Sequence, residues 1–272
     1  MHEINVTSKV RSIALFVGAG VCNAKCAHCA GLIHRPFAPK KDGVVDEWHV
    51  MQVLRSCHEK GARSLSLTSS GEPTLSPKAV TRLMNIVHAL SQKSVGFSDI
   101  HLYTNGIRIG RDEKFAARFL PLWRRLGLTK LYVTVHNTDP ALNAKVYGIK
   151  KYPDLGTIFS RIRRADLKIR VNLMLSRKTV HTLPQFVHTV CHLEALGVDA
   201  ISAWPIRNAD DTPDKKRGPS KKELDRMEAW INERDGKPCV MRLLREQSRV
   251  AYDEGEKLTL FPNGVLSNTW CK

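Results

Sequence analysis

The chain has 272 residues and is 42% hydrophobic, which is enough for one large domain with a proper core, or for one domain with an appendage. No apolar run of about 18 residues occurs, and the polar start lacks a signal-peptide pattern, so we expect no membrane span and a cytoplasmic protein. Seven unevenly spaced cysteines argue against a disulfide framework and favour metal or redox chemistry, and a formal net charge of +17 favours an anionic partner.

Strand-like and helix-like stretches alternate along most of the chain. Nearly continuous apolar runs, typical of strands covered on both faces, occur at residues 12–18, 64–70, 99–105, 130–137, 168–176 and 200–208. Amphipathic, helix-like stretches lie between them at residues 46–61, 76–92, 113–127, 153–165 and 182–197. Several begin at a capping residue such as Asp46, and three end at a glycine such as Gly61. The alternation predicts right-handed βα units around a mostly parallel sheet.

The last quarter of the chain has a different character. Residues 210–220 are rich in charge, Pro and Gly and indicate an exposed loop, and residues 220–236 indicate a further helix. Two short β-like runs flank Pro262-Asn263-Gly264, which predicts a hairpin. We therefore predict a core at residues 1–208 and a C-terminal extension at residues 209–272, made of loop, helices and hairpin.

Six βα units are too few to close an eight-stranded barrel, so they predict an open doubly wound sheet or a curved partial barrel. In both folds, ligands bind at the carboxyl ends of the strands. Polar residues gather at these ends: residues 22–29 follow the first strand, residues 70–73 the second and residues 104–106 the third. Thr134 and His136 end the fourth strand. These positions predict one site at this end of the sheet.

Three cysteines lie close together in "CNAKCAHC", at Cys22, Cys26 and Cys29. A structural zinc ion normally takes four ligands, often in CxxC pairs, and only the last two cysteines form such a pair, although His28 and His34 could complete the set. An iron–sulfur cluster is the other solution, because three cysteines can hold three irons and leave a fourth iron open for an external ligand. The residues alone leave both centres open.

The same stretch matches the CxxxCxxC signature of the radical S-adenosylmethionine (SAM) superfamily, and other segments also resemble that family. "SSGEPTL" resembles the family's GGEP motif, "YTNG" follows the third strand as it does there, and residues 134–177 resemble the region from the fourth strand to the fifth. The resemblance covers about residues 12–208 and implies a (βα)₆ partial TIM-like barrel with mostly parallel strands. Two positions depart from the family: His28 replaces an aromatic residue, and Ser70 replaces the first glycine of GGEP.

The resemblance implies the cofactors and the type of reaction. Cys22, Cys26 and Cys29 would ligate three irons of a [4Fe–4S] cluster, and the amino and carboxylate groups of SAM would chelate the fourth. With one electron from a donor such as flavodoxin or ferredoxin, reductive cleavage of SAM would give a 5′-deoxyadenosyl radical that abstracts hydrogen from a substrate. His28 would stack beside the adenine.

The turn after the second predicted strand is expected to hold the methionyl ammonium group of SAM. By the resemblance, Gly71, Glu72 and Pro73 would carry this role, with mostly backbone carbonyl groups facing the ligand, and Gly71 would permit close backbone approach. The alternative for Glu72 is a structural hydrogen bond to a neighbouring loop.

Five further residues are expected to contact the ribose or the carboxylate of SAM. Asn105, Thr134 and His136 are candidates for either group, with a structural role as the alternative for His136. Asn172 is placed to reach the ribose. Arg170 shares the same face of its strand and would pair with the SAM carboxylate or form a plain salt bridge.

The other four cysteines are expected to have different roles. Cys57 and Cys191 fall in helical patterns and are expected to be buried free thiols. Cys239 and Cys271 flank the predicted hairpin and are too few to hold a second cluster. We predict a hydrogen-donor or radical-trapping role for Cys271 at the mouth of the barrel.

The charge favours a nucleic-acid or nucleotide-type anionic substrate. Residues 107–177 contain 16 basic and 5 acidic residues, but many of these belong to predicted helices that would lie outside the barrel. The basic loop at residues 214–222 follows the last predicted strand and could meet a polyanion. Trp204 and Arg207 are expected to border the substrate.

Three other functions stay open on the sequence. One is the modification of a peptide or protein, including the activation of an enzyme by a glycyl radical, and another is a small-molecule transformation. The last is a non-enzymatic zinc-binding module, which would leave Gly71-Glu72-Pro73 unexplained. The sequence does not predict an oligomeric state.

Overall fold

The computed structural model describes residues 9–18, 20–26, 28–29, 46–208, 212–234, 239–245 and 256–268. Nine strands form one sheet in the order β7-β6-β5-β4-β3-β2-β1-β8-β9. All neighbouring strands are parallel except β8 and β9. The bounds are β1 Ser12–Phe16, β2 Ser64–Thr68, β3 Asp99–Thr104, β4 Lys130–Val135, β5 Lys168–Leu175, β6 Ala200–Pro205, β7 Val240–Leu243, β8 Lys257–Leu260 and β9 Leu266–Ser267.

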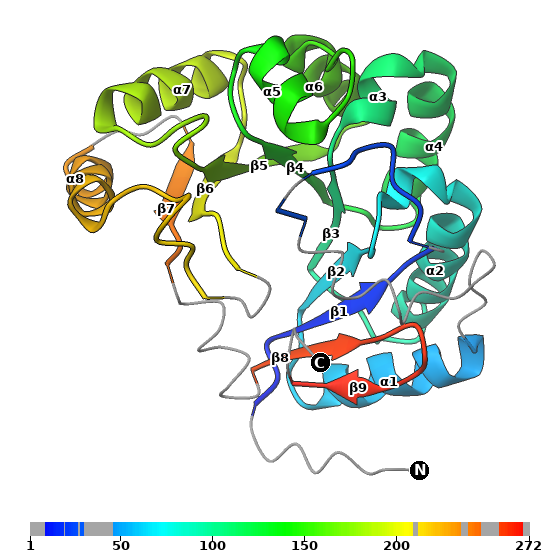
Figure 1. Cartoon of the computed structure of the whole chain (residues 1–272). Helices are drawn as coiled ribbons and strands as arrows, with labels where there is room; N and C mark the ends of the chain where they lie inside the picture. The colour runs from blue at the N-terminus through cyan, green and yellow to red at the C-terminus, as the bar shows by residue number, and fades with distance from the viewer. Residues whose placement is uncertain are drawn as a thin grey trace.

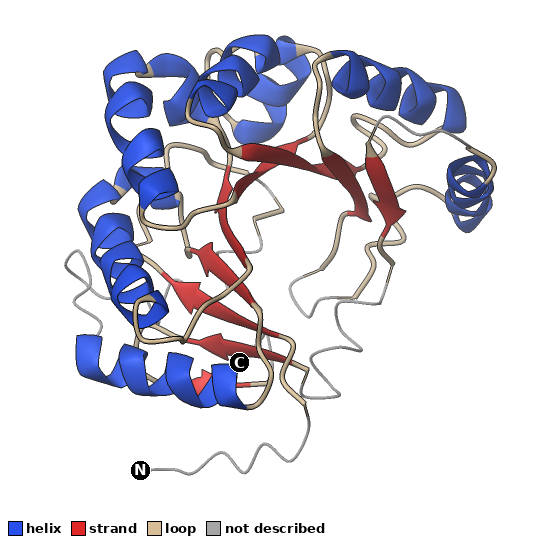
Figure 2. Cartoon of the chain, turned by 180° about the vertical axis from the view of Figure 1, so that it is seen from behind, coloured by secondary structure: helices blue, strands red, loops and turns tan. Residues whose placement is uncertain are grey.

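The sheet is curved and open, and the helices cover its convex side (Figure 1, Figure 2). The helices are α1 Glu47–Glu59, α2 Pro77–Ser91, α3 Ile107–Arg111, α4 Glu113–Arg125, α5 Pro140–Tyr147, α6 Leu155–Arg164, α7 Leu183–Ala195 and α8 Lys221–Asn232, with a short 3-10 turn at Pro73–Leu75. The prediction of an α/β partial barrel with mostly parallel strands is therefore confirmed. No helix in the described part of the chain is long and apolar enough to cross a membrane.

Alternation along each strand separates an apolar face from a polar face. On β5, the side chains of Ile169, Val171 and Leu173 are fully buried in the core beneath the helices. Arg170 and Asn172 lie between them and face the concave side of the sheet, because side chains alternate across a strand. The same alternation on the neighbouring strands makes the concave side polar and leaves it partly exposed.

The helix ends follow the sequence signals. The Asp46 side chain accepts hydrogen bonds from the backbone N–H groups of Trp48 and His49 and so caps α1. Gly61 and Gly127, just after α1 and α4, have φ values of 105° and 109°, a conformation that L side chains rarely adopt. The sequence did not predict α3 or α5, which are short.

The C-terminal segments extend the sheet at both edges. The predicted hairpin is present as β8 and β9, joined by a turn in which Gly264 has a φ of 82°. β8 also pairs in parallel with β1, and β7 pairs in parallel with β6, neither of which the sequence predicted. Strands from beyond residue 208 thus flank the six predicted strands in one sheet. The domain division at residue 208 stays a prediction.

Candidate active site at the carboxyl ends of the strands

The segment that contains Cys22, Cys26 and Cys29, called the cysteine segment below, follows β1 at the carboxyl end of the sheet. Cys22, Cys26 and Cys29 are all half-buried, and none forms a disulfide. Cys22 and Cys26 pack against the edge of the hydrophobic core. The three thiols thus come from one segment that is anchored by apolar contacts and still reached by solvent.

The turn after β2 is pressed directly against this segment. The backbone N–H of Glu72 donates a hydrogen bond to the carbonyl of Val21 at 2.8 Å. A Cβ atom at Gly71 would lie 2.2 Å from the Val21 oxygen and 2.4 Å from the Gly20 oxygen, distances that no side chain can adopt. Gly71 is therefore needed for the close approach of two backbones, and this contact sets the position of Cys22.

Helix α5 holds the cysteine segment from the other side. The Lys25 N–H donates to the carbonyl of Tyr147 at 2.8 Å, at the last residue of α5. Gly148 follows with a φ of 60°, and a Cβ there would lie 3.1 Å from the Lys25 oxygen. Asp139 caps the first turn of α5 by accepting from Ala141 N–H at 2.7 Å. Backbone hydrogen bonds at Val21 and Lys25 thus hold this part of the segment from two sides.

The Glu72 carboxylate joins the turn after β2 to the turn after β3. Its Oε1 accepts from Thr74 N at 3.1 Å, Thr74 Oγ1 at 2.7 Å and Thr104 Oγ1 at 2.7 Å, and its Oε2 accepts from Asn105 N at 2.7 Å. Burial raises the pKa of Glu72, while the hydrogen bonds from Asn105, Thr104 and Thr74 act in the opposite direction. These four bonds favour the structural role for the Glu72 side chain, and the predicted contact of the turn with SAM stays a prediction.

Asn105 links the turn after β3 to the cysteine segment. Its Nδ2 donates to Asn23 Oδ1 at 2.8 Å and lies 3.9 Å from Cys22 Sγ, while its Oδ1 accepts from Ile107 N at 3.0 Å. Tyr152 donates its hydroxyl to the Asn105 carbonyl at 2.8 Å. An amide N–H beside a sulfur that binds metal is the type of outer contact that orients a ligand. The predicted contact of Asn105 with SAM stays a prediction.

A row of aromatic rings lies beside the cysteine segment. His28 meets His136 edge to face with centroids 5.1 Å apart, His136 meets Tyr147 at 4.9 Å, and Tyr147 stacks on Tyr152 at 5.2 Å. Burial, and then the nearby His28, lower the pKa of His136 to about 3. Burial, and then Arg217, lower the pKa of His28. Both imidazoles are therefore neutral at pH 7, and His136 Nδ1 is buried without a hydrogen-bond partner in the described structure.

The remaining residues that were predicted to contact SAM lie on the concave face of β4 and β5, at two positions along the strands. Thr134 and Asn172 are paired in register near the carboxyl ends, and the Thr134 carbonyl accepts from the hydroxyl of Tyr147. Arg170 pairs with Tyr132, two residues closer to the amino ends of the strands. It forms no salt bridge in the described part of the chain. Its guanidinium donates to the Tyr132 hydroxyl at 3.0 Å and to Ser202 Oγ.

The donor set fits an iron–sulfur cluster. Among the described residues, no three His, Cys, Asp or Glu side chains converge closely enough to hold a single metal ion. A cuboidal cluster needs a different arrangement, because each thiolate binds its own iron at a separate corner. Three half-buried thiols on one anchored segment, beside an amide donor, match that requirement. His34, the other candidate ligand for zinc, lies outside the described residues, as does Cys271.

The predictions for the two cysteines in helical patterns have different outcomes. Cys57 is buried, as predicted, and burial raises its pKa to about 12. The prediction for Cys191 is wrong, because its position on α7 faces solvent rather than the core.

The two residues that were predicted to border the substrate are neighbours at the end of β6, where the Arg207 guanidinium lies 5.7 Å from the centroid of the Trp204 ring. The sequence also missed Tyr147 and Tyr152, because their ring contacts depend on α5.

Comparisons with known proteins agree with this geometry. The family model described as the radical SAM superfamily matches residues 17–189. The chain therefore belongs to the radical SAM superfamily, and the fold class and the two cofactors of that family, a [4Fe–4S] cluster and SAM, are as predicted. The crystal structure of Streptococcus suis SuiB has a TM-score of 0.67 and 14% identity, covering 96% of this chain and 60% of that one. A SAM-bound structure of the same protein gives 0.66 and 15%, with the same coverage.

Part of the chain is also similar to curated proteins. GTP 3′,8-cyclase of Vibrio cholerae serotype O1 is 27% identical over 169 residues, which is 61% of this chain and 47% of that protein. GTP 3′,8-cyclase of Haemophilus ducreyi is 30% identical over 177 residues, which is 63% of this chain and 47% of that protein. The chain thus spans about half the length of the curated relatives it matches.

Proposed function

We propose that this chain is an enzyme that cleaves SAM reductively and uses the resulting radical chemistry on an anionic, nucleotide-type substrate. The observation that carries the proposal is the joining of three turns at one end of the sheet. The cysteine segment, the Gly71-Glu72-Pro73 turn and the Asn105 turn are held together by the bonds from Glu72 N to Val21 O and from Asn105 Nδ2 to Asn23 Oδ1.

Cys22, Cys26 and Cys29 would hold the cluster, with Asn105 Nδ2 near the first of these sulfurs. When bound, the cluster and SAM supply one-electron cleavage of the sulfonium and hydrogen abstraction from the substrate. The task of the protein is to fix the thiols, to orient SAM and to keep charge and water away. The neutral row of His28, His136 and Tyr147 contributes to that last task, because burial disfavours the charged form of each ring.

The backbone of Ser70, Gly71 and Pro73 would hold the methionyl ammonium, since the Glu72 side chain is engaged by its four donors. His28 would lie beside the adenine. Thr134 and Asn172, paired on the concave face, would reach the ribose, and the unpartnered Nδ1 of His136 is a candidate for a polar group of SAM.

The substrate class is inferred from charge and from relatives. The net charge of +17 favours an anionic substrate, and the matched relatives bear the name GTP 3′,8-cyclase, which supports a nucleotide over a peptide. We further propose a flavodoxin- or ferredoxin-type electron donor, a cytoplasmic location and a hydrogen-donor role for Cys271. Residues 1–208 would form the catalytic core, and residues 209–272 the extension whose strands enlarge its sheet.

Anaerobic reconstitution with iron and sulfide tests the cluster assignment. The wild-type protein should show iron–sulfur absorbance and, with dithionite and SAM, release 5′-deoxyadenosine. Cys22→Ala should lose both signals. Cys191→Ala is the matched control, since Cys191 is exposed on the outer helix α7, and it should retain both. Continued SAM cleavage by Cys22→Ala would overturn the assignment.

A further inference from the structure

Arg170 is a partly buried cation on the concave face with only neutral partners. Its Nη1 donates to the Tyr132 hydroxyl at 3.0 Å, its Nη2 donates to Ser202 Oγ, and its Cζ lies 4.5 Å from the centroid of the Tyr132 ring. Its Nε is buried and has no hydrogen-bond partner. A guanidinium has five N–H donors, so these contacts leave donors unused.

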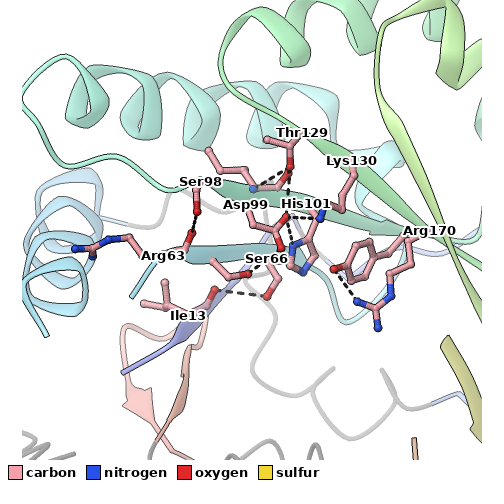
Figure 3. A network of polar contacts seen from close by, with 12 residues as sticks. Ile13, Arg63, Ser66, Ser98, Asp99, His101, Thr129, Lys130 and Arg170 are labelled. Carbon is pink, nitrogen blue, oxygen red and sulfur yellow. Dashed lines mark hydrogen bonds and ion pairs between the residues drawn. The ribbon is translucent and has the colours of Figure 1, made fainter. Parts of the chain in front are cut away.

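Two described carboxylates at the amino ends of the strands are already paired with other cations. Asp99 lies 3.0 Å from Lys130 Nζ, and Glu256 lies 2.7 Å from Arg11 Nη2. Within the residues that the structure describes, no carboxylate forms an ion pair with Arg170. Figure 3 shows Arg170 at the margin of the network around Asp99, with its guanidinium turned away from that carboxylate.

Two more cations share this side of the sheet. Lys257, at the start of β8, pairs in register with Ser12, and the buried Ile13 and Leu258 that follow face the core, so Lys257 lies on the concave side. Burial, and then the positive charge of Arg170, lower the pKa of Lys257, while Glu256 acts in the opposite direction. Arg242 on β7 is exposed and pairs in register with Ser202, so its side chain lies on the same face as the Ser202 hydroxyl that Arg170 contacts. The described concave face therefore carries an excess of positive charge.

Burying a guanidinium without a counter-ion destabilises a folded protein. Such an arrangement is expected where a ligand supplies the missing negative charge. The planar donors of an arginine match the oxygens of a phosphate group, and a neighbouring lysine adds a point charge. Hydroxyls from Tyr132 and Ser202 fix the guanidinium in place before a ligand binds.

The height of Arg170 on the sheet separates it from the expected SAM site. Arg170 lies two residues below Asn172 on β5, toward the amino ends of the strands. Tyr132, its hydrogen-bond partner, stacks on His101 with centroids 3.9 Å apart, and His101 belongs to the network at the amino ends. None of the described contacts of Arg170 involves the cysteine segment or residues 71–73.

We propose that Arg170, supported by Lys257 and Ser202, forms a subsite for a phosphate group of the substrate on the concave face below the cysteine segment. This inference rests on the proposed function, because it assigns a position to the anionic part of that substrate. Arg242 lies at the rim of the subsite, where it would attract the ligand. The subsite also replaces the predicted pairing of Arg170 with the SAM carboxylate.

Calorimetric titration of inorganic triphosphate into the anaerobically reconstituted full chain tests the subsite. Wild type should bind triphosphate, Arg170→Gln should weaken binding at least about tenfold, and Arg170→Lys should be intermediate. Arg125→Gln is the matched control, because it removes the same charge from an exposed position on the outer helix α4, and its affinity should stay within about twofold of wild type. Equal losses in Arg170→Gln and Arg125→Gln, or no binding by wild type, would overturn the proposal.

Two further measurements separate the alternatives. The affinity of Arg170→Gln for SAM should stay within about twofold of wild type, and a loss of SAM binding with unchanged triphosphate binding would assign Arg170 to SAM instead. The ligand-free thermal unfolding midpoint of Arg170→Gln should equal or exceed that of wild type, because an uncompensated charge is removed. A clear decrease in the midpoint would indicate a structural role. A failure of the proposed function would appear separately, as wild type that binds triphosphate without cleaving SAM.

Discussion

Two buried or half-buried carboxylates lie at opposite ends of the neighbouring strands β2 and β3, and their partners differ in kind. Glu72, beyond the carboxyl end of β2, accepts four hydrogen bonds from neutral donors, namely two backbone amides and two threonine hydroxyls. These bonds tie one turn to the next. No cation takes part in them.

Asp99, at the amino end of β3, lies beside a lysine and a histidine. Lys130 Nζ lies 3.0 Å from Oδ1 and His101 Nδ1 lies 3.5 Å away, while the hydroxyls of Ser64 and Thr129 add weaker contacts (Figure 3). Burial alone would raise the pKa of Asp99, but His101 and Lys130 hold it well below its usual range. The Asp99 charge is therefore balanced by an ion pair with Lys130.

The difference indicates a division of tasks along the strands. At the carboxyl end, neutral hydrogen bonds fix the shape of the turns without placing a side-chain cation of their own beside the thiolates that would hold the cluster. At the amino end, Asp99 neutralises Lys130, while Arg170 forms no ion pair within the residues that the structure describes. Fixed geometry thus lies where a cofactor must be oriented, and charge lies where an anion would be bound.

Replacing Glu72 tests the carboxyl end and should have the largest effect. Glu72→Ala leaves two backbone amides and two threonine hydroxyls without their acceptor in a buried site, so the free energy of unfolding should fall by roughly 3–5 kcal/mol. Urea denaturation under anaerobic conditions measures this loss. Iron content after reconstitution should fall as well, because the contact with the cysteine segment loosens.

Glu72→Gln is the informative companion variant. Its carbonyl oxygen can still accept the three bonds now made by Oε1, whereas its amide nitrogen would face the Asn105 N–H, so an intermediate loss is expected. A loss below about 1 kcal/mol in Glu72→Ala would contradict the structural role and favour direct contact of the carboxylate with SAM.

The sequence predicted the central sheet because β1 to β6 are nearly continuous apolar runs separated by clear helical patterns. The strand β7 and the parallel pairing of β8 with β1 were missed for a physical reason. Both β7 and β8 have only four residues, and β7 alternates buried and exposed positions, so neither differs in composition from a loop or hairpin arm. The pairing of β8 with β1 joins residues far apart in the chain, which local periodicity cannot reveal.

In the site, too, the sequence predicted features that depend on residue spacing and did not predict contacts between segments far apart in the chain. Spacing alone placed Cys22, Cys26 and Cys29 on one segment, and strand order brought Gly71 and Asn105 to the same end. The partners of the Glu72 side chain depend on how two turns meet, so its four donors could not be predicted. Helix α5, which anchors Lys25, was missed because its apolar residues are spread around the helix rather than along one face.

Replacing Asp99 tests the amino end, with a smaller expected effect. Asp99→Asn removes the charge that neutralises Lys130, and because both groups are partly exposed, the loss at pH 7 should be about 1–2 kcal/mol. The folded-state pKa of Asp99 is depressed, so the stabilisation is present above about pH 4 and is lost as pH falls through the lower folded-state pKa.

The difference between wild type and Asp99→Asn should therefore shrink steadily below about pH 4 in urea titrations. Glu113→Gln is a suitable control, since the Glu113 carboxylate pairs with two arginines on the outer helices at 3.4 Å and is mostly exposed. It should change stability by less than about 1 kcal/mol. An Asp99→Asn effect that does not depend on pH would contradict the ion-pair account.

His136→Phe tests whether the carboxyl end excludes charge, and it should have the smallest effect near pH 8, below about 1 kcal/mol. Phe keeps the ring contacts with His28 and Tyr147, and His136 Nδ1 has no hydrogen-bond partner to lose in the described structure.

At lower pH, the free energies of unfolding of wild type and His136→Phe should differ. The unfolded chain protonates His136 below about pH 6.5, whereas burial keeps the folded-state pKa at about 3. Wild type should therefore lose up to about 1.4 kcal/mol of stability for each pH unit by which the pH falls between these values. His136→Phe should remove this part of the slope, while His192→Gln, which changes an exposed imidazole, should not. An unchanged slope in His136→Phe would show that the carboxyl end accommodates a charged imidazole, and the contrast with Asp99 would then not hold.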